Sequence, residues 1–207
     1  MTAPGKPIDA IVLGGSAGAL DALAVLVAAL PATCPLAVVV VLHLPPTRPS
    51  RLASVMAARC LLPVREIEDK DPVVPGVVFV APPDYHALIE RARTFALSQD
   101  HLVHFSRPAI DVLFESAADA YGDRLAGVVL SGANADGARG LAAIERAGGT
   151  CLVQAPATAA VRDMPEAALA ATPGARALPV DELAAWLGAA ARGGAQAGGP
   201  TPGSASP

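Results

Sequence analysis

Short runs of Val, Ile and Leu alternate with Ala- and Leu-rich segments of helical length along most of this chain. The apolar runs cover Ile8–Leu13, Leu36–Leu42, Leu125–Leu130 and Thr150–Val153. Continuous apolar runs without a polar face are typical of parallel strands that helices cover on both faces. The sequence therefore predicts an α/β fold, a doubly wound, mostly parallel sheet with helices on both faces.

Helix-like segments separate these runs, and one stretch of the chain breaks the alternation. The expected helices are Leu20–Leu30, Arg48–Arg59, Ile110–Tyr121, Ala138–Ala147, Pro165–Ala171 and Asp181–Ala191. From Val64 to Phe105 the pattern changes to short β runs interrupted by Pro, Gly and charged residues. These runs are Val77–Val80, Ala87–Ile89 and Thr94–Leu97. We interpret this stretch as a small antiparallel β insertion within the same domain.

Length and composition predict one domain followed by a tail. The 207 residues are 53% hydrophobic and 16% charged, which suffices for one core built from Ala, Val and Leu. We assign residues 1–192 to this domain. Residues 193–207 contain only Gly, Pro, Ala, Ser and Thr with one Gln, so they lack core formers and are expected to be disordered.

Charge, hydropathy and cysteine usage exclude several classes of protein. A net charge of −4 argues against nucleic acid as a partner, because phosphate binding needs a basic surface. The longest apolar runs, Ala22–Leu30 and Leu36–Leu42, are too short to span a membrane, and no signal-peptide pattern opens the chain. Three separated cysteines predict neither disulfides nor a zinc framework. We expect a cytoplasmic protein without membrane insertion, metal or cofactor.

A glycine-rich loop follows the first predicted strand, at the sheet edge where open α/β proteins bind ligands. Gly14–Gly18 matches G-x-S-x-G, a turn that exposes the Ser16 hydroxyl and leaves the Ala17 amide free for an oxyanion. From this loop alone, a nucleophile and a phosphate-binding or merely packed turn are equally acceptable. A dinucleotide fingerprint fails, because it needs Gly at position 16 and an acid where the second strand ends in His43.

His43 opens the second loop, His43–Pro46, and is the expected general base for Ser16. Adjacent parallel strands bring their carboxyl ends together, and an imidazole beside a hydroxyl activates it. The alternative is a histidine that merely closes a strand. His101 and His104 are three residues apart in a polar stretch, and we expect no carboxylate or thiolate ligand beside them in the fold, which argues against a metal site.

The third loop, Ser131–Gly137, supplies the expected acid. Asp136 can orient and charge-balance an imidazole, as the third member of a catalytic triad does. Its alternative is the N-cap of the Ala-rich helix that follows, since Asp is a favoured capping residue. Asp111, at the start of another predicted helix, is the rival acid.

Six motifs, in this order, resemble the catalytic domain of the chemotaxis protein-glutamate methylesterases, which are also glutamine deamidases. They are Gly14–Gly18, His43–Pro46, Val80–His86, Arg107–Phe114, Leu130–Gly137 and Asp163–Pro165. The resemblance extends from about Ile8 to about Leu187. It places the family's serine, histidine and aspartate on Ser16, His43 and Asp136.

The resemblance implies an enzyme that hydrolyses glutamyl methyl esters of a chemoreceptor, with glutamine deamidation as a second reaction. The receptor's cytoplasmic region is then the partner and residues 1–192 are the catalytic domain. The backbone at Ala17 and Ala133 is expected to bind the oxyanion, and Arg107 and Met164 are the candidate substrate-binding residues.

Some residues depart from the family pattern. Ala17 stands where members often have Thr, Gly132-Ala133-Asn134 replaces the usual Gly-Met-Gly, and Ala19 replaces a glycine. Members commonly carry an amino-terminal receiver domain, but only seven residues precede the first predicted strand. We therefore expect an uninhibited chain, with a separate receiver protein as a candidate partner. The departures leave open a second hypothesis, a non-catalytic binding or scaffold module of the same fold.

Overall fold

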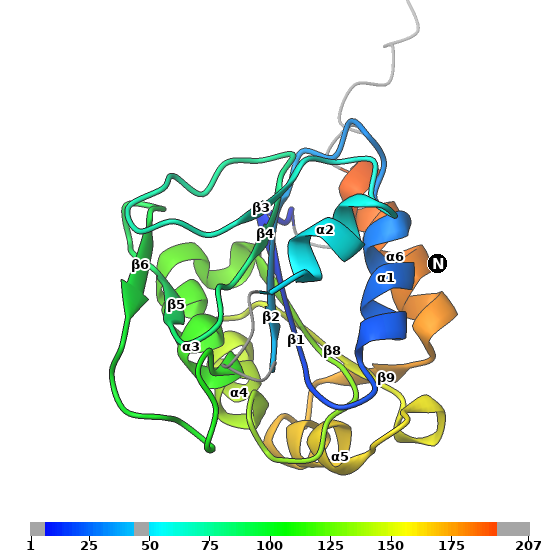
Figure 1. The fold of residues 1–207 in the computed structure, drawn as a ribbon. Helices are drawn as coiled ribbons and strands as arrows, with labels where there is room; N and C mark the ends of the chain where they lie inside the picture. Colours follow the sequence, from blue (N-terminus) through cyan, green and yellow to red (C-terminus); the bar gives the residue numbers. More distant parts are fainter. Residues whose placement is uncertain (1–6, 44–49, 194–207) are drawn as a thin grey trace, which may run out of the picture.

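A central sheet with helices on both sides forms the body of the protein (Figure 1). The computed structural model describes residues 7–43 and 50–193. Seven parallel strands follow the order β3-β4-β2-β1-β7-β8-β9. Their bounds are β1 Ala10–Gly15, β2 Ala37–Leu42, β3 Val64–Glu66, β4 Val78–Val80, β7 Leu125–Val129, β8 Thr150–Gln154 and β9 Arg176–Leu178. The predicted doubly wound α/β fold is confirmed.

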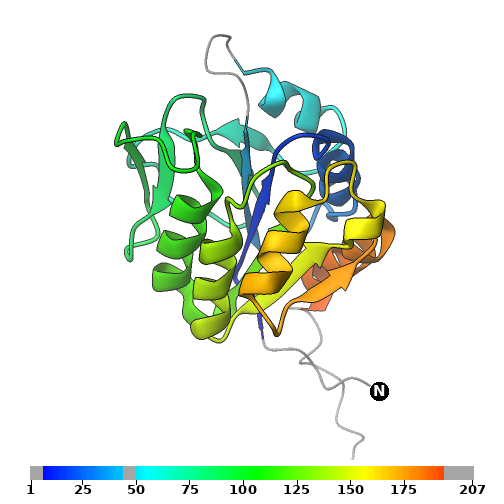
Figure 2. The same cartoon turned by 90° about the horizontal axis from the view of Figure 1, so that it is seen from below.

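Two helical layers explain why the central strands are apolar throughout. Helices α3 (Ile110–Tyr121), α4 (Ala138–Arg146) and α5 (Asp163–Ala171) lie side by side over one face (Figure 2), and α1 (Leu20–Ala28), α2 (Leu52–Ala57) and α6 (Val180–Gly193) cover the other. Along β1, Ala10 and Val12 belong to the first core, and Ile11 and Leu13 to the second. Short 3₁₀ turns at Gly122–Arg124 and Pro156–Thr158 complete the structure. Within residues 7–43 and 50–193, no helix combines the length and apolar character needed to cross a bilayer.

The antiparallel insertion is smaller than the sequence predicts. Among the described residues, β5 (His86–Ile89) and β6 (Phe95–Ser98) are the only two strands that pair in this way, beside isolated antiparallel bridges at Pro72–Thr94 and Val103–Ser106. Strand β4 instead joins the parallel sheet between β2 and β3. The edge strands β3 and β9 were not expected. Each has three partly exposed residues, so neither carries the apolar run by which a buried strand is recognised.

Two sequence predictions extend beyond the described residues. The second loop is described only at His43, and residues 44–46 lie outside the described part of the chain. Helix α6 ends at Gly193, so the first residue of the predicted tail is helical and residues 194–207 lie outside the description.

The amino-terminal end of α3 packs directly on β1 at Gly14. A Cβ built on Gly14 would overlap the side chain of Ile110, the first residue of α3. Glycine is therefore required here for close approach rather than for an unusual backbone angle. This contact places the first amides of α3 beside the carboxyl end of the sheet.

We expect Gly14→Ala to lower the free energy of unfolding by about 1–3 kcal/mol, because the added methyl overpacks the contact with Ile110. Chemical denaturation of the purified variant measures this loss. Ile110→Ala in the same background should recover part of it, since the two side chains would couple. Strictly additive effects of the two substitutions would contradict this account of Gly14.

Candidate active site

The three loops meet at the carboxyl edge of the sheet. Strands β1 and β2 pair Gly15 with Leu42, so the residues that follow them are neighbours. The His43 amide donates to the Gly15 carbonyl at 3.1 Å, and the Ser16 amide donates to the Ser131 carbonyl at 2.9 Å. Backbone hydrogen bonds thus hold the serine loop between the other two.

His43 and Asp136 form a hydrogen-bonded pair. Nε2 of His43 lies 2.8 Å from Oδ2 of Asp136, and the side chains are 10% and 0% exposed. A carboxylate only accepts, so Nε2 carries the proton and Nδ1 holds the basic lone pair. Nδ1 lies 3.2 Å from Oγ of Ser106. Sequence reasoning missed Ser106, whose only signal is its place directly before the Arg107 motif.

Several polar groups at and beside the Ser16 turn have no hydrogen-bond partner in the part of the chain that the structure describes. Ser16 is half-buried, and its hydroxyl has no hydrogen-bond partner within residues 7–43 and 50–193. In the same described part of the chain, the amides of Ala17 and Ala133 donate to no acceptor. A Cβ at Gly132 would lie 3.0 Å from the Ser16 Cβ and 2.6 Å from the Met164 Cε, so a side chain there would require the end of Met164 to move.

Asp136 binds the amino-terminal end of α3. Its Oδ2 accepts from the Ile110 amide at 2.7 Å and its Oδ1 from the Asp111 amide at 2.9 Å. The partial positive charge of a helix start stabilises a carboxylate placed there. The alternative that Asp136 caps the helix after it is wrong. The N-cap residue of α4 is Gly137, and the Asp136 carboxylate accepts from amides of α3 instead.

Asp111, in the first turn of α3, binds the amino-terminal end of α4. Its Oδ1 accepts from the Gly137 amide at 2.9 Å and the Gly140 amide at 2.7 Å, at the start of α4. The side chain is fully buried, and Oδ2 has no hydrogen-bond partner among the described residues. Burial raises the pKa of Asp111 and repulsion by Asp136 adds to this, while the Gly140 amide and nearby Arg139 oppose the rise.

His104 lies next to this acidic pair. Its Nε2 is 3.3 Å from Oδ2 of Asp111, so the interpretation that no acid accompanies His104 is wrong. The start of α3 brings the two together although they are not adjacent in the sequence. With Asp136 they form the one group of three within the described residues whose donor atoms, all within 4.8 Å, could hold a metal ion.

A cavity of about 120 Å³ opens beside His43. It is lined by His43, Asp84, Leu102, Phe105, Ser106, Arg107 and Pro108. The Arg107 guanidinium donates to the Asp84 carboxylate and to the carbonyls of Gln99 and Asp100, so it fastens the wall of the cavity. Met164 is fully buried and supports the loop from below. Substrate binding by Arg107 or Met164 stays a prediction.

A histidine–aspartate pair lies at the carboxyl edge of a doubly wound sheet, beside backbone amides that have no acceptor among the described residues. This edge is where open α/β proteins place their ligands, so the class of protein is an α/β domain with a candidate active site there. Residues 11–187 match the family model described as CheB methylesterase. The chain belongs to the CheB methylesterase family.

Individual relatives agree with this assignment. A Leptospira interrogans protein is 41% identical over 85% of this chain and 91% of its own length; it carries the provisional name protein-glutamate methylesterase/protein-glutamine glutaminase. The Caulobacter vibrioides protein-glutamate methylesterase/protein-glutamine glutaminase 2 is 36% identical to this chain. The match covers 91% of this chain and 56% of the Caulobacter protein. The crystal structure of the Thermotoga maritima CheB methylesterase catalytic domain superposes with a TM-score of 0.81 at 29% identity, covering 87% of this chain and 97% of that one.

The raised pKa of Asp111 predicts how stability depends on pH. An acid whose pKa is higher in the folded state stabilises that state fully below its unfolded pKa, near 3.8, and this contribution is lost as pH rises through the folded pKa. Relative to Asp111→Asn, the wild type should therefore lose unfolding free energy as the pH rises above the unfolded pKa of 3.8. Denaturant unfolding of both proteins at increasing pH measures the difference, and a constant or growing wild-type advantage would contradict the prediction.

Proposed function

We propose that this protein is a serine hydrolase that removes methyl groups from glutamyl methyl esters on the cytoplasmic region of a chemoreceptor, in chemosensory adaptation. The 2.8 Å pair of His43 and Asp136 beside the Ser16 turn carries the proposal. Family membership and the names of the relatives support the same reaction and the same class of substrate.

Ser16 is the proposed nucleophile. Its Oγ attacks the ester carbonyl carbon while its proton passes to Nδ1 of His43. The amides of Ala17 and Ala133 donate to the oxyanion that forms on the carbonyl oxygen. The tetrahedral intermediate then breaks its bond to the methoxy oxygen, which takes the proton from Nδ1 and leaves as methanol.

Water completes the cycle. It attacks the acyl group on Ser16, gives a proton to Nδ1 of His43, and the Ser16 oxygen leaves with that proton. The products are a glutamate side chain and the free enzyme, so one ester and one water give one acid and one methanol. With a glutamine side chain as substrate, the same steps release ammonia in place of methanol.

Asp136 stabilises the imidazolium and holds the proton on Nε2 of His43. Two amides of α3 fix the carboxylate, so the histidine is oriented by a helix rather than by a mobile side chain. A buried, fixed charge of this kind needs little reorganisation when the imidazolium forms.

The alternative is a non-catalytic binding module of the same fold. The convergence of Ser16, His43 and Asp136 at one sheet edge counts against it, because binding alone does not require the three together. A methylated receptor region distinguishes the two hypotheses: binding without methanol release would favour the module. A separate receiver protein is the proposed regulatory partner, and the cytoplasm the proposed place of action.

Ser16→Ala should reduce methanol release from methylated receptor by about 10³-fold or more, as removal of a triad member does. The fold should persist, because the hydroxyl has no partner to lose among the described residues. Gas chromatography of methanol and thermal melting on the same preparation measure both effects. Ser54→Ala, an exposed serine on α2, is the matched control and should keep wild-type activity. A Ser16→Ala rate within about tenfold of wild type would remove Ser16 from the mechanism.

Asp136→Asn should lower turnover at least about 100-fold, with partial recovery at high pH, because the amide cannot charge-balance the imidazolium. Stability should also fall by about 1–2 kcal/mol, since both carboxylate oxygens accept from α3 amides. Asp119→Asn, at an exposed position of α3, is the control and should change neither quantity appreciably. Retention of most activity in Asp136→Asn would show that Asp136 only holds the helix.

A further inference from the structure

Ser106 and Ser16 both lie near His43, and both need Nδ1 of its ring as a hydrogen-bond acceptor. Oγ of Ser106 lies 3.2 Å from Nδ1 of His43, while Nε2 is bonded to Asp136. A neutral imidazole has one lone pair, here on Nδ1. The single proton of the Ser106 hydroxyl has two acceptors within reach, this lone pair at 3.2 Å and the His104 carbonyl at 3.4 Å, and Nδ1 is the nearer. The Ser16 hydroxyl needs that lone pair to pass on its proton.

We propose that Ser106 is a positioning residue that holds His43 in a resting arrangement, so that Nδ1 must exchange its bond to Ser106 for one to Ser16 before acyl transfer begins. This rests on the proposed function for the role of Ser16. It accounts for two observations together: the hydroxyl on the imidazole belongs to Ser106, and the Ser16 hydroxyl is without a partner among the described residues.

The turn that carries Ser106 is strained. Val103 and Ser106 exchange two backbone hydrogen bonds, at 3.2 and 2.9 Å, and the two residues between them have positive φ angles of 48° and 61°. Asn and Gly favour such positions, but here they hold His104 and Phe105. A non-glycine residue in this region raises the energy of the backbone and persists only where its surroundings hold it.

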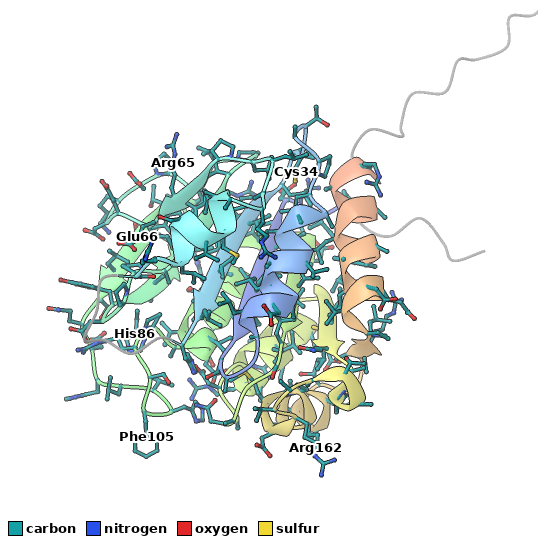
Figure 3. All side chains as sticks on the ribbon, turned by 45° about the vertical axis from the view of Figure 1, so that its right-hand side comes forward. Cys34, Arg65, Glu66, His86, Phe105 and Arg162 are labelled. Atoms are coloured by element: carbon teal, nitrogen blue, oxygen red, sulfur yellow. The ribbon has the colours of Figure 1, made fainter. Side chains whose placement is uncertain are left out.

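Contacts on the His104 side hold the turn. The Asn134 amide donates to the His104 carbonyl at 3.3 Å, and Nε2 of His104 lies 3.3 Å from the buried Oδ2 of Asp111. Phe105, by contrast, is 97% exposed and points away from the body (Figure 3). The turn is thus anchored through His104, while the side chain of Phe105 is exposed, which suits a segment that moves when Ser106 releases His43.

Nitrogen-15 NMR of the His43 ring tests the resting arrangement without any substrate. We expect the Nδ1 signal to shift in Ser106→Ala, and to stay near its wild-type position in Ser16→Ala and in Ser106→Thr, which keeps the hydroxyl. A shift in Ser16→Ala with none in Ser106→Ala would overturn the proposal. Because the measurement needs no turnover, it is decisive even if the protein releases no methanol.

Covalent labelling of Ser16 by a small phosphonofluoridate tests the exchange. Removal of the competing hydroxyl in Ser106→Ala should speed labelling about 2- to 10-fold, the range expected for one neutral hydrogen bond, and Ser106→Thr should react at the wild-type rate. A purely structural role would slow labelling instead, and an unchanged or lower rate overturns the proposal. Peptide mass analysis identifies the labelled residue, and a label on Ser106 overturns both the proposal and the nucleophile role of Ser16.

Discussion

The first amides of α3 and α4 are satisfied by two buried carboxylates that cross between the helices. Asp136, in the loop before α4, accepts from the start of α3, and Asp111, in the first turn of α3, accepts from the start of α4. Unpaired amides at a buried helix start are costly, so each helix requires the other's acid. This reciprocal capping fixes the two helices against each other and against the sheet edge.

The orientation of His43 follows from that arrangement. The oxygen of Asp136 that accepts from the Ile110 amide also faces Nε2 of His43, so the position of α3 sets the position of the imidazole. The close contact of Ile110 with Gly14 in turn fixes α3 on β1, the strand that ends at Ser16. The start of α3 therefore both packs on β1 and fixes the acid that orients His43, although no single helix or strand contains the whole site.

Two buried acids so close together also create an electrostatic problem. Burial and repulsion by Asp136 raise the pKa of Asp111. The Arg139 guanidinium and the His104 imidazole lie 3.8 Å and 3.3 Å from its Oδ2. His104 belongs to the strained turn that ends at Ser106. Asp111, which caps α4, therefore also holds the turn that carries Ser106, and the Ser106 hydroxyl contacts Nδ1 of His43. Asp136 contacts Nε2 of the same ring, so the two acids act on opposite sides of the imidazole, one directly and one through the turn.

The sequence by itself determined the fold class, because strands buried on both faces must be apolar throughout, and it located Ser16 and His43, because parallel strands end at one edge. It also offered Asp136 as a candidate acid from its loop, and the family resemblance favoured that role over a helix cap. Tertiary structure alone decided which helix Asp136 caps, that Asp111 faces His104, and that Ser106 contacts His43. These pairs are set by how helices and turns distant in the chain pack together, and no local pattern encodes that packing. The short edge strands β3 and β9 escaped prediction for a related reason, since half-exposed strands of three residues have no apolar run and exist only because a neighbouring strand offers its free hydrogen-bonding groups.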